Sequence, residues 1–300
     1  MTETRCGFVT LIGAPNSGKS TLTNALVGAK VTIVTHTAQT TRGPILGIAL
    51  QGDSQIILVD TPGIFQPKRR LDRAMSDAAW TRAAEADLVV LVIDAKRSID
   101  HVLDPIFANL SEVKCPMVAV LNKIDLVARP ELLHLTADLT KSYSFTRTFI
   151  ISALTGDGVP DVKSYLASGV PPGPWLYPED QLTDAPLRQA AAEITRERLF
   201  LRLHDELPYS LTVETDSWKE LPNGSVRIEQ TVYVMRDSQK KIVLGAHGAT
   251  IKEISMAARK EISKMIDTPV HLFLFVKVRR RWGEDSARYR EMGLNYPKEG

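Results

Sequence analysis

Apolar residues in the first half of the chain occur in short runs without polar alternation. Examples are Phe8–Ile12, Asp87–Ile93 (apolar from its second residue on) and Pro116–Leu121. Such runs are typical of strands that are buried on both faces of a sheet. Longer helical stretches separate them, so the pattern predicts an α/β domain with a doubly wound, mostly parallel sheet.

The remaining elements of the first half follow from periodicity and turn residues. Only Gln51–Ser54 separates two of its strands, which predicts an antiparallel hairpin at the sheet edge. The expected strands are Pro44–Leu50, Gln55–Val59 and Thr148–Ile151, and the expected helices are Ser20–Val27, Arg73–Glu85, Asp100–Leu110, Pro130–Ser142 and Pro160–Ala167.

Four prolines within residues 169–184 interrupt this pattern and predict a semi-rigid linker. We therefore expect one domain over residues 1–168 and another over residues 185–300, including a C-terminal tail. The second half has the order helix, strand, strand, helix, helix, strand, which predicts an α+β domain. Its expected elements are Leu187–Glu206, Tyr209–Glu214, Ser225–Met235, Gln239–Leu244, Ala249–Ile266, Val270–Val278 and a tail helix Ser286–Met292.

Composition places the chain among globular proteins. Its 300 residues are 44% apolar and carry a net charge of +2, but residues 236–281 hold eleven Lys or Arg against four acids. That local excess is typical of a site for a polyanion.

Cys6 and Cys115 form no metal or disulfide pattern. The N-terminus lacks a signal-peptide pattern, and no apolar run approaches 18 residues, so we expect a cytoplasmic protein.

The stretch from Gly13 to Ser20 matches the phosphate-binding P-loop G-x-x-x-x-G-K-[ST] and lies between a predicted strand and a predicted helix. Backbone N–H groups and the helix N-terminus would face the phosphates. Lys19 would reach the β- and γ-phosphates, and Ser20 would bind Mg²⁺. The predicted phosphate-binding residues are Gly13, Asn16, Ser17, Gly18, Lys19, Ser20 and Thr21.

The motif N-K-x-D at Asn122, Lys123 and Asp125 follows the strand Pro116–Leu121 and predicts guanine specificity. The Asp125 carboxylate can accept from the ring N1–H and the 2-amino group, which adenine does not offer. Charge-assisted bonds of this kind are worth about 1.5–3 kcal/mol each, enough for at least tenfold discrimination. Asn122 suits either base N7 or a loop-bracing role. Ser152 and Ala153 fit a weaker base-contacting motif, S-A-x.

Two further segments between these motifs suit a metal and a γ-phosphate. Asp60, in D-T-P-G, can hold Mg²⁺ through water, and the N–H of Gly63 can bond the γ-phosphate. In the loop Gln39–Arg42 a threonine should coordinate Mg²⁺, and Thr41 is favoured over Thr40. The predicted metal ligands are thus Ser20, Thr41 and Asp60, and the nucleotide is GTP or GDP.

The sequence lacks one residue that Ras-type enzymes use in catalysis. Ras-type enzymes place a water-orienting Gln after the glycine of this motif, but here that residue is Ile64. Asn16 with a monovalent cation such as K⁺ is the candidate replacement, and slow turnover is expected. The predicted catalytic set is Asn16, Lys19, Thr41 and Gly63. Arg42 could stabilise charge in cis, but a solvated loop arginine is favoured.

In the second half, Gly245-Ala246-His247-Gly248 joins two predicted helices. A G-x-x-G turn between helices is how KH domains bind a single-stranded nucleic-acid backbone. With the order of elements it predicts a type II KH domain. The predicted RNA-binding residues are Gly245, Ala246, His247, Gly248, Ile251, Lys252 and Arg281. For Arg281, a solvated strand end is the alternative interpretation.

These motifs together resemble the bacterial Era GTPase family over almost the whole chain. The residues that carry the resemblance are Pro15 and Asn16, Gln39–Arg42, Asp60–Ile64, Asn122–Asp125, Tyr177–Gln181, Glu206–Ser210 and Gly245–Lys252. The resemblance implies a slow GTPase that assists assembly of the small (30S) ribosomal subunit and binds the 3′ end of 16S rRNA. It also implies a cytoplasmic location with peripheral membrane association. Nothing in the sequence demands more than a monomer.

Three other functions are compatible with parts of this sequence. A GTPase whose second domain binds a protein or membrane is the main alternative, but the G-x-x-G turn and the basic excess favour RNA. A GTP-driven tRNA-modifying enzyme would need a further catalytic site, such as a reactive cysteine near a base. The N-K-x-D motif disfavours a P-loop kinase.

Two departures from the family pattern concern Ala14 and Ser17, where Arg and Val are usual, and His247, where a lysine or another base is usual. Imidazole is mostly neutral above pH 7. We therefore predict that His247→Lys binds single-stranded RNA more tightly than wild type at pH 7.5, and that wild-type affinity rises towards pH 6. Equal affinities of the two proteins at pH 7.5, measured by RNA titration, would contradict this prediction.

Overall fold

The computed structural model describes residues 3–37, 39–67, 69–97, 103–203, 207–280 and 285–297. Its contacts divide the chain into two compact units. The first unit contains Met1–Val34, Thr41–Asp184 and Tyr289–Gly300, and the second contains Thr35–Thr40 and Ala185–Arg288. Compared with the boundaries expected from the linker, the segment 35–40 packs with the second unit and the end of the tail packs with the first.

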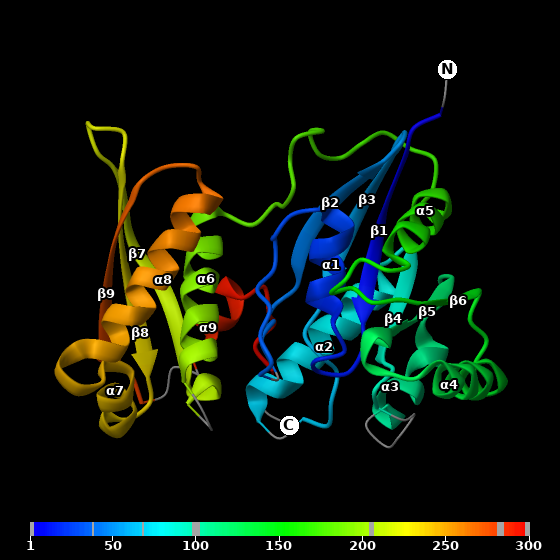
Figure 1. The fold of residues 1–300 in the computed structure, drawn as a ribbon, viewed down its shortest axis with the longest axis horizontal. Coiled ribbons are helices and arrows are strands. Elements are labelled where there is room, and N and C mark those ends of the chain that lie inside the picture. The colour runs from blue at the N-terminus through cyan, green and yellow to red at the C-terminus, as the bar shows by residue number, and fades with distance from the viewer. Residues whose placement is uncertain are drawn as a thin grey trace. The chain divides into compact units, whose positions relative to one another are not determined.

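A six-stranded sheet forms the centre of the first unit, in the order β2-β3-β1-β4-β5-β6 (Figure 1). All neighbours are parallel except β2 and β3, which form the expected antiparallel hairpin. The strands are β1 (Arg5–Ile12), β2 (Ile45–Gln51), β3 (Ser54–Asp60), β4 (Leu88–Asp94), β5 (Met117–Asn122) and β6 (Arg147–Ile150). The predicted mostly parallel sheet is confirmed.

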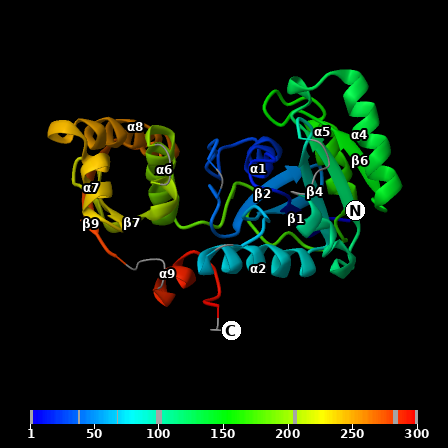
Figure 2. The same cartoon turned by 90° about the horizontal axis from the view of Figure 1, so that it is seen from below.

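Helices cover both faces of this sheet, which explains why its strands lack polar alternation (Figure 2). Helices α1 (Lys19–Val27) and α5 (Val159–Gly169) pack on one face through a core that includes Leu22 and Leu166. The other face carries α2 (Arg70–Ala84), α3 (Asp104–Phe107) and α4 (Arg129–Ser142).

Several helices differ from their predicted limits, and the structure explains two of these differences. The helix expected over 100–110 is shorter, because α3 ends at Phe107 and a separate 3₁₀ turn follows at Leu110–Glu112. Leu103, Ile106 and Leu110 are all buried at helical spacing, so two short segments achieve the burial expected of one helix. Helix α2 starts before Arg73, because the Asp72 carboxylate accepts a 2.9 Å hydrogen bond from the Arg69 backbone N–H and caps the helix there.

The second unit has a three-stranded sheet in the order β7-β8-β9, with helices α6 and α8 on one of its faces (Figure 2). The sheet pairs β7 and β8 antiparallel and β8 and β9 parallel. Its elements are α6 (Leu187–Arg202), β7 (Leu211–Glu220), β8 (Val226–Val234), α7 (Asp237–Leu244), α8 (Ala249–Met265) and β9 (Val270–Val278). The predicted α+β order is confirmed.

Strand β7 is longer than the predicted Tyr209–Glu214. Its pairing with β8 shifts register between Thr215 and Ser217, so an extra residue interrupts the alternation of buried and exposed positions. The second half of the strand was therefore hidden from a period-two pattern. Residues Pro208–Ser210, by contrast, form a 3₁₀ turn.

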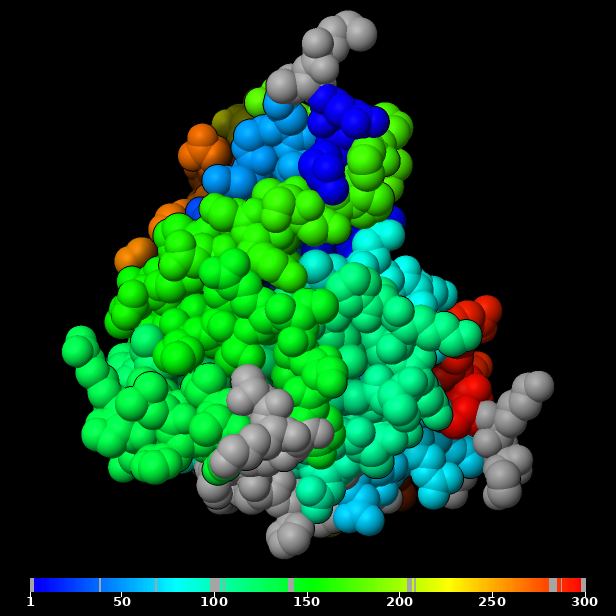
Figure 3. Space-filling model, turned by 90° about the vertical axis from the view of Figure 1, so that its right-hand side faces the viewer, coloured from blue at the N-terminus to red at the C-terminus, as the bar shows by residue number. Residues whose placement is uncertain are grey.

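The chain ends with α9 (Ser286–Glu291) and a segment that packs on α2 within the first unit. Tyr289 and Leu294 are buried against Ala74 and Met75, and the Arg70 guanidinium donates to the Tyr296 hydroxyl. In Figure 3 the red C-terminal residues lie beside the cyan of α2. The tail therefore covers the helix that follows the D-T-P-G motif.

The central strands predict where the first unit loses most stability. Leu58 on β3 has no exposed surface, whereas Leu133 on α4 is 70% exposed. We expect Leu58→Ala to lower the free energy of unfolding of the first unit by about 2–5 kcal/mol, because it removes buried methyl groups and leaves a cavity. Leu133→Ala is the control and should stay within about 0.5 kcal/mol of wild type. Urea titration of both variants measures this, and equal losses would contradict the burial of Leu58.

Candidate nucleotide and nucleic-acid sites

The P-loop connects β1 to α1 and needs glycine at both ends of its motif. Gly13 has φ 152° and Gly18 has φ 99°. A Cβ added at Gly13 would lie 2.3 Å from the Val92 carbonyl oxygen, and one at Gly18 would lie 2.1 Å from Asn122 Nδ2. Both positions therefore exclude side chains through conformation and through space.

Lys19 is only 6% exposed, and the loop backbone surrounds its ammonium group. Its Nζ donates to the carbonyl oxygens of Gly13 (3.1 Å) and Ala14 (3.0 Å). Burial lowers the pKa of Lys19 to about 8, although nearby Asp60 acts in the opposite direction. A phosphate beside this group would favour its charged form.

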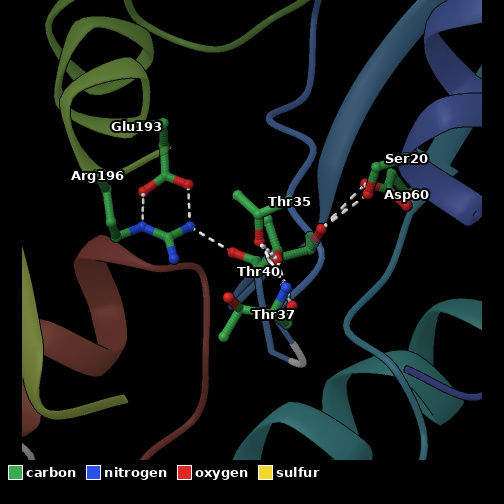
Figure 4. A network of polar contacts seen from close by, with 8 residues as sticks. Ser20, Thr35, Thr37, Thr40, Asp60, Glu193 and Arg196 are labelled. Atoms are coloured by element: carbon green, nitrogen blue, oxygen red, sulfur yellow. Dashed lines mark hydrogen bonds and ion pairs between the residues drawn. The ribbon is translucent and has the colours of Figure 1, made fainter. Parts of the chain in front are cut away.

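Three oxygen-bearing side chains from three separate segments meet beside the P-loop (Figure 4). Ser20 Oγ donates to Asp60 Oδ2 over 2.7 Å, and it lies 3.0 Å from Thr41 Oγ1. Thr41 Oγ1 also lies 3.3 Å from Asp60 Oδ2. Thr40 is not part of this cluster, because its hydroxyl bonds Thr35 and the carbonyl of Thr37.

Asp60 is fully buried, and its Oδ1 has no hydrogen-bond partner among the described residues. Burial raises the pKa of Asp60 to about 6, against the lowering effects of Ser20, Lys19 and Thr41. A buried carboxylate oxygen without a partner, next to two hydroxyls, fits a hard divalent cation, since Mg²⁺ and Ca²⁺ prefer oxygen ligands. The donor set therefore suits the predicted magnesium ion.

Asn122 braces two loops, which is one of the two roles considered for it. Its Nδ2 donates to the Ser17 carbonyl (2.9 Å), and its Oδ1 accepts from the Ala153 N–H (2.9 Å). Its side chain is 2% exposed. With its amide engaged on both sides, Asn122 joins the P-loop to the S-A-L segment.

Lys123 has a partner that sequence reasoning missed. Its Nζ donates to the Asn16 carbonyl (2.6 Å) and to Asp94 Oδ2 (2.7 Å). Asp94 ends β4 as Asp60 ends β3, so an acid at the carboxyl end of a buried strand was the available signal. The pair holds the N-K-I-D loop against the P-loop.

Asp125 is exposed, in contrast to its neighbour Asn122. Ser152 Oγ donates to Asp125 Oδ1 over 2.6 Å, which orients the carboxylate. Ala153 is buried, while Leu154 is 80% exposed. An oriented, accessible carboxylate is what recognition of the guanine N1–H and 2-amino group requires.

Other predicted residues of this site lie in the same loops. Asn16 is half-buried with a left-handed backbone (φ 62°), Ser17 Oγ is buried without a partner among the described atoms, and Thr21 is half-buried on α1. Gly63 lies against Pro15, so a Cβ there would approach the Pro15 backbone to 2.7 Å.

Ile64 is 1% exposed and packs in the apolar core with Ala14, so its side chain cannot face a nucleophilic water.

The expectation that Arg42 is solvated is wrong, because Arg42 is only 5% exposed. The adjacent Gly43 lies against the Met292 carbonyl of the C-terminal segment, where an added Cβ would clash. The tail, which is remote in sequence, covers this part of the loop.

In the second unit the turn Gly245–Gly248 separates α7 from α8 and leaves its middle residues exposed. Gly245 (φ 72°) is crowded, since an added Cβ would lie 2.2 Å from Thr250 Oγ1, whereas Gly248 (φ 78°) faces open space. His247 also has positive φ (50°). Ile251 is half-buried and Lys252 exposed on the first turns of α8.

Exposed cations lie on the elements that flank this turn, from α7 along α8 to the end of β9, within the basic stretch that the sequence identified. They are Arg236, Lys241, Lys252, Arg259, Lys260, Lys264, Lys277, Arg279 and Arg280. Of these, Arg279 forms an ion pair with Asp285 (2.7 Å). Arg281, the remaining predicted RNA contact, lies outside the described residues.

Comparisons with known proteins identify a GTPase domain in the first half of the chain and a KH domain in the second. Residues 8–123 match the model of the 50S ribosome-binding GTPase family, and residues 206–283 match that of the KH domain. The GTPase Era of Afipia carboxidovorans is 62% identical over 99% of this chain and 96% of its own length. The GTPase Era of Rhizobium meliloti is 61% identical over 98% of this chain and 94% of its own length.

Two solved structures are similar over nearly the whole fold, each at 34% identity. Aquifex aeolicus Era bound to GDP and AlF4⁻ has a TM-score of 0.90 and covers 96% of this chain and 99% of its own. Era in complex with MgGDPNP and nucleotides 1506–1542 of 16S ribosomal RNA has a TM-score of 0.92. The match covers 97% of this chain and 99% of that one. With its P-loop, N-K-I-D loop and G-A-H-G turn in these positions, the chain belongs to the Era family of GTPases, which carry a KH domain.

Proposed function

We propose that this protein hydrolyses GTP slowly, binds the 3′ end of 16S rRNA through its second unit and assists assembly of the small ribosomal subunit. The observation that carries the RNA part is the exposed G-A-H-G turn between two helices, within a surface of exposed cations. A relative solved with MgGDPNP and 16S rRNA nucleotides supports the same choice of ligand.

In the nucleotide site, each predicted residue has a distinct task. Lys19 would bind the β- and γ-phosphates, and Asp125, oriented by Ser152, would select guanine. Ser20, Thr41 and Asp60 would hold Mg²⁺, which neutralises charge on the transferred phosphoryl group. Asn122 and Lys123 would act on the nucleotide indirectly, by keeping three loops in place.

Catalytic water needs an orienting group other than Ile64. Asn16, whose backbone is left-handed at the turn of the P-loop, would take this role, and K⁺ is the monovalent cation proposed beside it. The Gly63 N–H would bond the γ-phosphate and lose that bond on hydrolysis. Slow turnover follows from the absence of a polar side chain at position 64.

We expect the protein to act in the cytoplasm. Within the part of the chain that the structure describes, no helix combines the length and apolar character needed to cross a bilayer. Peripheral membrane association and a monomeric state stay predictions.

Asp125→Asn tests guanine recognition. The amide can no longer accept from both guanine donors, so GTP affinity should fall at least about tenfold. The new NH₂ group can donate to the 2-oxo group of xanthine, so XTP should bind the variant more tightly than GTP. Nucleotide titrations of wild type and variant measure both effects. Unchanged GTP preference in the variant would show that Asp125 does not face the base.

The double variant Ala246→Asp, His247→Asp tests the RNA site without disturbing either glycine. Two new carboxylates on an exposed turn should repel the phosphate backbone and abolish measurable binding of a single-stranded RNA from the 16S 3′ end. For wild type, three or four phosphate contacts predict a log–log salt slope of about −2 to −3.

Lys219→Asp is the matched control, because it changes the net charge equally at an exposed position on β7. It should keep RNA affinity near wild type. Equal losses in both variants would mean that net charge, not the turn, determines binding. Absence of RNA binding by wild type with GTP analogue, GDP or no nucleotide would favour a protein or membrane partner for the second unit.

A further inference from the structure

Arg196 on α6 is a buried arginine that bonds the backbone of a distant loop. Its side chain is 2% exposed, and its Nη2 donates to the Thr40 carbonyl oxygen over 2.5 Å. Its Nε donates to Glu193 Oε1 (2.8 Å), and its Nη2 also pairs with Glu193 Oε2, so the carboxylate orients the guanidinium plane (Figure 4). All these residues belong to the second unit.

The ion pair alone does not explain this burial. Burying a guanidinium is costly unless its donors are satisfied, and Arg196 Nη1 is buried without a partner among the described residues. Two other arginines of α6 pair with acids at more exposed positions. Arg198 is 24% exposed beside Glu261, and Arg202 is 50% exposed beside Glu253. Among these three, the bond to a loop carbonyl distinguishes Arg196.

The Thr40 carbonyl belongs to the peptide group that also contains the Thr41 nitrogen. A peptide group is planar, so a bond that fixes this carbonyl also fixes the direction in which the chain enters Thr41. Thr41 in turn places Oγ1 3.0 Å from Ser20 Oγ and 3.3 Å from Asp60 Oδ2. One peptide group therefore separates the Arg196 contact from the predicted magnesium ligands.

Residues Thr35 and Thr37 of the preceding turn also restrain Thr40. Its hydroxyl donates to the Thr37 carbonyl (2.7 Å) and lies 2.5 Å from Thr35 Oγ1. The two consecutive threonines thus have different tasks. Thr40 is held by the turn and by Arg196, and Thr41 is directed towards Ser20 and Asp60.

We propose that Arg196, oriented by Glu193, is a positioning residue that holds the Thr40–Thr41 peptide so that Thr41 can join the magnesium ligands when GTP is bound. The proposal rests on the proposed function of Thr41 as a ligand of the ion at the γ-phosphate. GDP lacks that phosphate, so Arg196 should matter for binding of a triphosphate and not for GDP. The same residue would make the nucleotide state affect α6.

Helix α6 connects this contact to the RNA site inside the second unit. It packs along α8 through Arg198–Glu261 (2.8 Å) and Arg202–Glu253 (2.9 Å), and α8 begins directly after Gly248. If GTP raises RNA affinity by some factor, RNA must raise GTP affinity by the same factor. Removing the Arg196 bond should reduce that factor in both directions.

The test compares Arg196→Met with Arg198→Met and Arg202→Met in the full-length protein. Methionine keeps an apolar stem near Phe200, whose ring lies 5.1 Å from Arg196 Cζ, but cannot donate to Thr40. With Mg²⁺ present, we expect Arg196→Met to bind a non-hydrolysable GTP analogue about tenfold more weakly, while its GDP affinity stays at the wild-type value. Both control variants should resemble wild type with either nucleotide.

Arg196→Lys and Glu193→Gln carry the test if the methionine variant does not fold. Lysine keeps a cationic donor group but not the planar fork of arginine, and glutamine weakens the orientation of Arg196, so each should show a smaller loss for the analogue alone. Equal losses for analogue and GDP, no loss for either, or the same selective loss in Arg198→Met would overturn the proposal. A wild-type protein without a Mg²⁺-dependent preference for the analogue would instead overturn the proposed function of the site.

RNA titrations provide the second readout. The ratio of RNA affinities with analogue and with GDP should fall towards one in Arg196→Met, with RNA affinity in GDP unchanged. An unchanged ratio beside a loss of analogue affinity would overturn the link to α6. The Ala246→Asp, His247→Asp variant should instead lose RNA binding with both nucleotides, which distinguishes loss of the RNA site itself from loss of coupling.

Discussion

The buried carboxylate of Asp60 is the group on which the geometry of the nucleotide site depends. It lies at the end of a strand that is buried along its whole length, and one oxygen accepts from Ser20 while the other has no partner among the described atoms. Such a group is unfavourable as an anion unless a cation neutralises it. The site is therefore built to be complete only when a metal ion is bound, and Thr41 lies where it can respond to that ion.

Around this carboxylate, side-chain contacts hold the loops against each other. The amide of Asn122 and the ammonium of Lys123 join the P-loop to the N-K-I-D and S-A-L segments, and Asp94 completes the Lys123 contact. Preorganised loops reduce the entropy lost when a ligand binds. Asp125 remains exposed beside these braced loops, as its proposed role in base recognition requires.

The second unit combines an ordinary apolar core with an exposed glycine turn and a cationic surface. Gly245 is required by crowding from Thr250, whereas Gly248 leaves open space in which a phosphate backbone could approach. Exposed cations provide sequence-independent affinity for RNA. The contact of Arg196 with Thr40 adds to this unit a segment that, by sequence, belongs with the nucleotide-binding motifs.

Features that depend on short-range pattern could be predicted from the amino-acid sequence alone. Uninterrupted apolar runs predicted the buried strands, turn residues predicted the hairpin, and motif spacing located the loops that carry Lys19, Asp60 and Asp125. Element ends were less certain where a cap or a bulge altered the local pattern, as at α2 and β7.

Which side chains meet could be learned only from the folded chain, because those contacts join residues that are far apart in the sequence. The fold separated Thr41 from Thr40, engaged Asn122 with two loops, paired Lys123 with Asp94 and buried Arg42. It also brought Arg196 to the Thr40 carbonyl, a contact across 156 positions of the sequence. Such long-range pairs depend on packing and burial, which no local periodicity or motif encodes.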